Sequence, residues 1–152
     1  MFLGASKVTL DDKGREAMPA RYRDRIRDRA DGHLVVTANP PGPGDRHLRI
    51  YMHPDWEEAA SELTRLPGMH PITLALQRRL IGYASERDID GHGRILINLT
   101  LQEFAGIERH AMLVGQGSRL ELWDERRWKE QNDELDKDIF ADLPEEFMAL
   151  VL

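Results

Sequence analysis

A five-residue motif occurs twice in this chain, and its repetition constrains the fold more than any other feature of the sequence. Asp11-Asp12-Lys13-Gly14-Arg15 returns 79 residues later as Asp90-Gly91-His92-Gly93-Arg94. Residues 33–37 return as 110–114, 77 positions later, and residues 48–51 return as 120–123, 72 positions later. The spacing shrinks only across connections, which is where a structural repeat tolerates deletions. The sequence therefore predicts two copies of one structural unit.

Each copy is too short to fold alone. A unit of two short strands, a helix and a hairpin has under about 50 residues, and such a unit cannot bury an adequate core. The two copies must therefore pack together. We expect them to interlock about a pseudo-two-fold axis, which places both motifs on one surface and closes one small β-barrel.

Local patterns predict the elements, and the fold class is α+β. Strand-like runs cover residues 5–10, 16–18, 33–37 and 48–51, and a helix is expected over residues 20–30. Pro54 and Pro71 begin two further helices between the copies. The expected segments are a first unit (1–52), linking helices (53–81), a second unit (82–124) and an acidic helical segment (125–152).

The motif has the composition of a tight turn. Gly14 and Gly93 stand where a sharp reversal favours a residue without a Cβ atom, and Asp11 and Asp90 can accept hydrogen bonds from the backbone N–H groups that follow. The two arginines leave two interpretations open. Either they pair with the aspartates and hold the turn, or their planar donors project to grip phosphates or guanine edges. Repetition does not separate these interpretations, because a structural role repeats as readily as a functional one.

The net charge of −6 argues against binding nucleic acid by bulk electrostatics. The charge is segregated along the chain, however. Residues 1–30 carry a net charge of +3, from eight Lys/Arg and five acids, whereas residues 124–152 carry −6, from four bases and ten acids. The positive charge therefore lies in the part of the chain that holds the first motif.

Sequence signals for other chemistry are missing. The chain has no cysteine, and its six histidines show no HExxH pattern, so no metal site is expected. Neither a phosphate-binding loop nor a GxSxG motif is present, and we expect neither a cofactor nor an enzyme. The chain has no signal sequence and no run of 18 apolar residues, which predicts a cytosolic protein without a membrane partner.

Several further stretches join the doubled motif in a pattern that covers nearly the whole chain. They are Met1-Phe2-x-Gly4, Leu10-Asp11-x-Lys13-Gly14-Arg15-x-x-x-Pro19-x-x-x-Arg23, Asp90-Gly91-x-Gly93-Arg94, and Met112-Leu113-Val114-Gly115-Gln116 followed by Leu120-Glu121-Leu122-Trp123. Together they resemble the MraZ family of bacterial transcription regulators, to which the doubled D-x-x-G-R motif is specific.

The resemblance implies a fold, a function and a set of contact residues. The fold is a tandem pair of AbrB-like (SpoVT-AbrB) half-units that form one swapped-hairpin β-barrel. Family members assemble into ring-shaped homo-oligomers and bind short direct repeats of double-stranded DNA in their own promoter, usually repressing the division and cell-wall gene cluster. DNA contacts are expected from Lys13, Arg15 and Arg94, with His92 in the place opposite Lys13. Such a protein acts at the nucleoid in the cytoplasm and takes no small-molecule substrate.

The sequence departs from the family pattern at three positions. Leu3 stands where an Arg is common, Asn98 where the second copy usually has Pro, and Gln102 where the second copy often has Arg. We therefore expect the first motif to contribute more to binding than the second. In a ring, protomers that each present a weakly charged turn gain affinity through effective concentration.

A second hypothesis gives the function to the acidic C-terminal segment. Residues 124–152 would hold a basic protein, as an antitoxin-like partner does, and the doubled motif would only complete the fold. Under this alternative, deleting the segment abolishes function, whereas changing the motif does not.

Overall fold

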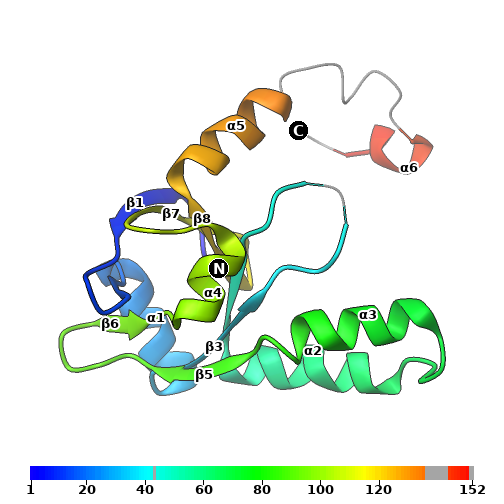
Figure 1. Ribbon diagram of the computed structural model, residues 1–152, viewed down its shortest axis with the longest axis horizontal. Coiled ribbons are helices and arrows are strands. Elements are labelled where there is room, and N and C mark those ends of the chain that lie inside the picture. The colour runs from blue at the N-terminus through cyan, green and yellow to red at the C-terminus, as the bar shows by residue number, and fades with distance from the viewer. Residues whose placement is uncertain (43, 136–143, 151–152) are drawn as a thin grey trace.

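The elements of the chain occur in the same order twice (Figure 1). The computed structural model describes residues 1–42, 44–135 and 144–150. The first copy contains β1 (Ala5–Thr9), β2 (Arg15–Ala17), α1 (Ala20–Ala30), β3 (His33–Ala38) and β4 (Leu48–Met52), followed by α2 (His53–Arg65) and α3 (Pro71–Leu80). The second copy contains β5 (Ser85–Asp88), β6 (Arg94–Leu96), α4 (Leu99–Ala105), β7 (His110–Gly115) and β8 (Arg119–Asp124), followed by α5 (Glu125–Leu135) and α6 (Glu145–Met148). The expected repeat is confirmed.

The larger sheet is built by exchange of strands between the copies. Its order is β1-β7-β8-β4-β3-β5, and every pair of neighbours is antiparallel. The first strand of each copy pairs with the hairpin of the other copy, so β1 lies beside β7 and β5 lies beside β3. The two hairpins meet in the middle of the sheet through β4 and β8. Neither copy can therefore form its part of the sheet without the other.

The smaller sheet shows the symmetry of the molecule directly. In it β2 pairs with β6, with Arg15 opposite Leu96, Glu16 opposite Ile95, and Ala17 opposite Arg94. At the repeat spacing of 79 residues, each of the outer pairs is the image of the other. The pseudo-two-fold axis therefore passes through the Glu16–Ile95 pair.

Strand pairing leaves the larger sheet open. Among the described residues, β1 and β5 are its two edge strands, and no ladder joins them. From each edge strand the chain turns directly into the two-stranded sheet instead of pairing with the other edge. The closed barrel expected from the sequence is therefore not shown by the strand pairs and stays a prediction.

One hydrophobic core is shared by the two copies. Its fully buried side chains include Ile26, Leu34 and Ile50 from the first copy. Ile97 and Leu113 of the second copy belong to the same cluster. This common core is what the short length of each copy requires, because neither copy alone encloses these side chains.

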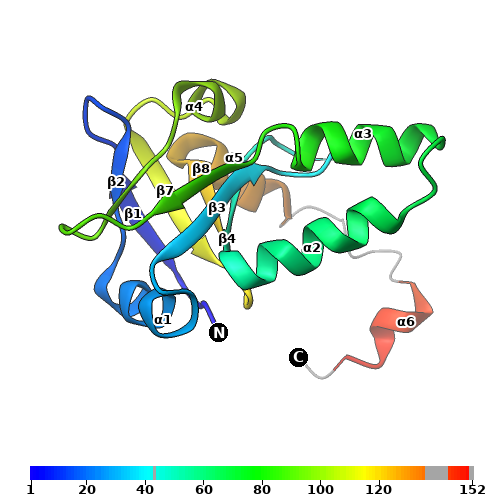
Figure 2. The ribbon, with the colours of Figure 1, turned by 90° about the horizontal axis from the view of Figure 1, so that it is seen from below.

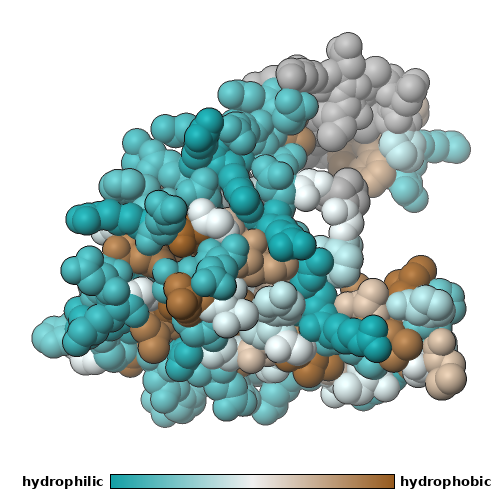
Figure 3. Space-filling model, viewed as in Figure 1, coloured by the Kyte–Doolittle hydropathy of each residue, from teal (hydrophilic) through white to brown (hydrophobic). Residues whose placement is uncertain are grey.

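The linking helices form a hairpin that projects from the sheet (Figures 1 and 2). Gln77 Nε2 of α3 donates a hydrogen bond of 3.1 Å to the carbonyl oxygen of Leu63 in α2. The outer end of the hairpin exposes Leu66, Met69 and Ile72, and a hydrophobic patch is visible there in Figure 3. None of the helices described by the structure is long and apolar enough to cross a membrane.

Candidate nucleic-acid interface

The first motif folds into the tight turn that the sequence predicts, between β1 and β2. Asp11 Oδ1 accepts hydrogen bonds from the backbone N–H groups of Lys13 and Arg15, each at 2.9 Å. The backbone N–H of Gly14 donates to the Asp11 carbonyl oxygen at 2.9 Å. The N–H of Arg15 is the main cause that lowers the pKa of Asp11 below its ordinary value. The carboxylate therefore stays charged and organises the turn.

The second motif repeats these contacts between β5 and β6. Asp90 Oδ1 accepts from the backbone N–H groups of His92 and Arg94 at 2.8 and 2.9 Å. Gly93 donates its N–H to the Asp90 carbonyl oxygen at 3.0 Å. The N–H of Arg94 is again the main cause that lowers the pKa of the aspartate. The two turns are thus built by the same hydrogen bonds.

The two turns are locked to each other across the pseudo-two-fold axis. Ile97 donates its backbone N–H to the carbonyl oxygen of Gly14 at 2.8 Å, and Met18 donates to that of Gly93 at 2.9 Å. Both glycines have positive φ, +82° and +76°, a conformation that side chains with a Cβ atom rarely adopt. The sequence pattern had assigned them to the sharp reversals where the structure places them.

Both arginines use one part of the guanidinium to hold a turn. Arg15 Nε donates to Asp11 Oδ2 at 2.9 Å, and Arg94 Nε donates to Asp90 Oδ2 at 3.2 Å. Arg94 also reaches across the axis, with its Nη1 atom 3.7 Å from Asp11 Oδ2. Within the described part of the chain, the Nη atoms of Arg15 have no recorded partner. The two interpretations are therefore compatible for Arg15, because its Nε braces the turn and its Nη atoms remain available; in Arg94, Nη1 also faces Asp11.

Lys13 and His92 occupy the tips of the two turns. Both side chains are exposed. Neither side chain makes a recorded contact with the residues that the structure describes, and only the backbone N–H groups of these two residues hold the turns. They are therefore free to contact a ligand without disturbing the fold.

Helix α1 adds a cation that sequence patterns did not assign to the site. A Cβ atom on Gly93 would lie 2.3 Å from Arg23 Nη1, so the guanidinium of Arg23 lies directly on the second turn. At the repeat position in α4, Gln102 lies on the first turn, since a Cβ atom on Gly14 would be 2.3 Å from its Nε2 atom. Each turn is thus covered by a helix of the other copy. The strand exchange that brings them together could not be read from the periodicity of the helix.

These features define a class of protein. It is a chain of two tandem, strand-exchanged half-units that presents two arginine-bearing turns side by side on one face. A family model described as "MraZ protein, putative antitoxin-like" matches this chain over residues 1–79 and again over residues 80–149. The chain therefore belongs to the MraZ family.

Three relatives of this chain share the name of a transcriptional regulator. The chain is 45% identical over 157 residues to "Transcriptional regulator MraZ" of Coxiella burnetii (strain Dugway 5J108-111), an alignment that covers 100% of both chains. It is 46% identical to the protein of that name from Tolumonas auensis, with 88% of this chain and 86% of the relative covered. The corresponding protein of Thioalkalivibrio sulfidiphilus is 43% identical, with coverages of 88% and 87%. The family resemblance expected from the sequence is confirmed.

Proposed function

We propose that this chain is a transcription regulator that binds double-stranded DNA through its two turns. The observation that carries the proposal is the coupling of the turns, since Arg94 reaches Asp11 and each glycine carbonyl accepts a hydrogen bond from the other copy. The coupling fixes two sets of cationic donors on one face. Donors held in fixed positions suit an extended, anionic ligand such as a DNA backbone. The names of the relatives support the regulatory part of the proposal.

In the first turn, Arg15 is the principal contact of the proposed complex. Its Nε atom is already bound to Asp11, so the side chain loses little conformational freedom when its Nη atoms bind phosphate or a guanine edge. Lys13 supplements it as a flexible point charge.

In the second turn, Arg94 is the corresponding contact. His92 lies at the exposed tip of the same turn, in the place that Lys13 occupies in the first turn. Arg23 lies against the same turn and contributes a further cation. The charge difference between the turns is therefore smaller than the two motifs alone suggest.

We further infer the finer features of the family for this chain. The targets are short direct repeats in the promoter of its own division and cell-wall gene cluster, which the protein represses at the nucleoid. Residues 1–52 and 82–124 form the DNA-binding body, whose two sheets curve into the swapped-hairpin barrel. Ring assembly uses the exposed apolar end of the α2–α3 hairpin, where Met69 is 93% exposed. Repeated sites and repeated turns then combine weak contacts into strong binding.

Substitution of Arg15 tests the proposal. The variant Arg15→Ala is expected to bind DNA from upstream of its own gene about 10-fold or more weakly, the range for a lost arginine contact to base or phosphate. The measurement is fluorescence anisotropy at fixed, moderate salt, with circular dichroism to show that the fold is kept. Arg126→Ala is the matched control, because the Arg126 side chain is 87% exposed on α5, outside the turns. Equal affinities of Arg15→Ala and the control would refute the proposed contact.

The description of the family model as antitoxin-like supports a second candidate function, namely binding of a partner protein. In it the acidic C-terminal segment holds a basic protein. Residues 136–143 and 151–152 of that segment lie outside the described part of the chain. Helix α5 itself packs on the body, since Arg127 Nη1 donates to the Ala105 carbonyl oxygen at 3.2 Å. A deletion of residues 136–152 therefore tests the part of the segment that follows α5. Unchanged DNA binding and unchanged repression in the deletion variant would exclude that part as the functional element.

A further inference from the structure

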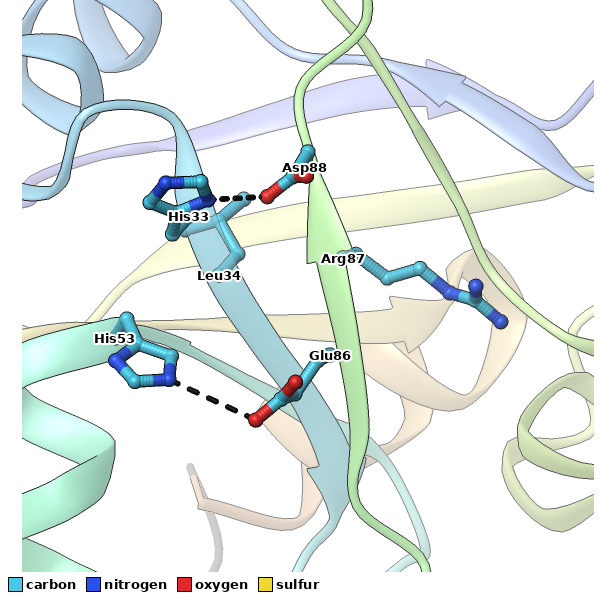
Figure 4. A pocket seen from close by; sticks show the side chains of 6 residues that line it. All are labelled: His33, Leu34, His53, Glu86, Arg87 and Asp88. Carbon is cyan, nitrogen blue, oxygen red and sulfur yellow. Dashed lines mark hydrogen bonds and ion pairs between the residues drawn. The ribbon is translucent and has the colours of Figure 1, made fainter.

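A cluster of ionisable side chains lies where β5 joins the larger sheet. They line a pocket of about 500 Å³ between β5, β3 and the start of α2 (Figure 4). The lining residues are His33, Leu34, His53, Glu86, Arg87 and Asp88. Figure 4 shows the two histidines facing Asp88 and Glu86, whereas Arg87 points to the other side of the strand.

Each histidine contacts a carboxylate on β5. His33 Nδ1 and Asp88 Oδ1 form a short hydrogen bond between directly opposed residues of β3 and β5. His53 Nε2 lies 3.7 Å from Glu86 Oε1, and His53 Nδ1 lies 3.5 Å from Glu57 Oε1 on its own helix. The edge strand β5 is thus tied to β3 and to α2 by two pairs that are ionic only when the imidazole is protonated.

The symmetry-related place on the other side of the axis contains the same constellation with the charges inverted. At the repeat spacings, Glu86, His53 and Glu57 correspond to Lys7, Glu125 and Lys129. The corresponding contacts are present, because Glu125 Oε1 lies 3.7 Å from Lys7 Nζ and 3.3 Å from Lys129 Nζ. The carboxylate of Glu125 therefore lies between two lysines, whereas His53 at the corresponding position lies between two carboxylates.

The two clusters respond to protons in different ways. Lysine and glutamate keep their charges throughout the neutral range, so Lys7 and Glu125 attract each other at any pH from about 6 to 9. A histidine loses its charge within that range, whereas the carboxylates that face it stay negative. At the higher end of the range, the ionic part of the attraction between β5 and its neighbours is therefore lost, whereas the backbone pairing of β5 with β3 remains.

The charged groups that face His33 in this cluster favour the protonated imidazole. His33 faces Asp88 on β5 and Asp31 at the end of α1, and the hydrogen bond to Asp88 is the main cause that raises the pKa of His33. His53 faces Glu86 and Glu57. Arg87, the one lysine or arginine among the lining residues, points to the other side of the strand (Figure 4).

We propose that this histidine–carboxylate cluster is a proton-dependent anchor of β5 and of the second turn, which follows β5 directly in the chain. The first turn follows β1, which is held by the Lys7–Glu125 ion pair. His110 also faces Glu125, but the Lys7–Glu125 pair itself does not depend on the charge of an imidazole. Lowering the pH from 8 to about 6 therefore makes the second turn less mobile and changes the first turn less. The consequence for DNA rests on the proposed function: contacts made by the second turn strengthen as the histidines gain protons.

Hydrogen–deuterium exchange of the free, full-length protein tests the anchor without DNA. Exchange rates at pH 6 and pH 8 are corrected for the intrinsic pH dependence of exchange. Protection of residues 85–94 is expected to rise about two- to fivefold at pH 6, the factor that corresponds to weak surface ion pairs. Protection of residues 5–15 is expected to change less. Equal changes in the two segments, or no change in residues 85–94, would overturn the proposal.

The matched variant replaces the histidine–carboxylate cluster with the side chains of the Lys7–Glu125–Lys129 cluster. His53→Glu, Glu57→Lys, Glu86→Lys and Asp88→Thr together give the first cluster the side chains that the repeat has at the corresponding positions. The pH response of residues 85–94 should then disappear, whereas His110→Gln, which changes the counterpart of His33, should retain it. If the fourfold variant fails to fold, His33→Gln and His53→Gln should each remove part of the response, and full retention in both would overturn the anchor. The exchange measurements use the free protein, so their result does not depend on whether Arg15→Ala affects DNA binding. The proposed anchor of β5 and the proposed DNA contacts can therefore be refuted separately.

Discussion

At the scale of single residues, the most unusual group is the carboxyl of Glu16. Glu16 is completely buried, and both of its side-chain oxygens lack a hydrogen-bond partner among the described residues. Burial raises the pKa of Glu16 from 4.5 to about 8, so the side chain is neutral at pH 7. Its repeat counterpart is the equally buried Ile95, which lies opposite it across the axis. A neutral glutamate therefore occupies what the second copy shows to be an apolar position.

Replacing Glu16 is expected to stabilise the protein. Above pH 4.5, release of this proton lowers the free energy of the unfolded chain. The folded chain does not gain this stabilisation, because it holds the proton up to about pH 8. At about 1.4 kcal/mol per pH unit, the buried carboxyl costs roughly 3 kcal/mol of stability at pH 7. Glu16→Ile should recover most of that amount, measured by urea denaturation, and its advantage should shrink towards pH 5.

The pH profile separates the carboxyl from ordinary packing effects. The stability of the wild-type protein should fall between pH 5 and pH 8 relative to that of Glu16→Gln, which keeps the shape but cannot ionise. Parallel stability curves for these two proteins would show that Glu16 is not a buried neutral acid.

Single residues also show how far the sequence predicts the site. The roles of Asp11 and Gly14 in the turn followed from residue type and spacing alone, because such turns are local. Burial of Glu16 and the position of Arg23 did not, since both depend on strand exchange between segments 79 residues apart. In a three-residue strand, alternation cannot show which face is covered.

At the scale of elements, the turns depend on the close approach of the opposite copy. A Cβ atom on Gly14 would lie 2.7 Å from the carbonyl oxygen of Ile97 and would keep the unfavourable positive φ. Gly14→Ala is therefore expected to destabilise the protein by roughly 1–3 kcal/mol and to weaken DNA binding through the displaced turn. Thermal and urea denaturation give the first effect, and fluorescence anisotropy gives the second.

The second turn supplies a control for this substitution. Gly91 has no atom within 4 Å of its ideal Cβ position and does not adopt a positive φ. Gly91→Ala should therefore change stability by less than about 0.5 kcal/mol. If both variants lose stability equally, tight packing at Gly14 is not the cause.

Helices were more predictable than the sheet. The expected helix over residues 20–30 coincides with α1, because its apolar spacing and the flanking Pro19 and Gly32 are local signals. The repeat implied that the copies interlock, yet it did not specify that β5 pairs with β3 and β1 with β7. Strand partners depend on contacts distant in sequence. Closure of the sheet, which the strand pairs do not show, would likewise require an edge-to-edge pairing that local patterns do not encode.

At the scale of the whole molecule, charged and apolar surfaces are divided among different regions. The two turns present cations, whereas the end of the α2–α3 hairpin exposes Met69 and Ile72. Isolated exposed apolar residues are common, but a cluster at the end of a projecting element is typical of a contact surface. This division agrees with the proposal that the hairpin mediates self-association and that the turns bind DNA.

Substitution at the hairpin tests this assignment. Met69→Glu with Ile72→Glu should reduce the molar mass of the assembly in light scattering, because both charges would have to be buried in the contact. Leu150→Glu, at an exposed apolar residue outside the hairpin, is the control. DNA binding by a single protomer should persist in the double variant at reduced affinity, since the turns are unaffected. An unchanged mass would place the contact elsewhere.

The pairing of Glu16 with Ile95 has a consequence for how such a molecule can change over time. In a dimer of identical half-units, every substitution appears twice, so an acid on the axis would face a second acid in the same dry core. Covalent joining of the halves removes that constraint, and each position can be altered on one side only. The lone glutamate and the charge-inverted lysine cluster are both differences of this kind, which a single chain of two half-units permits and a symmetric dimer would exclude.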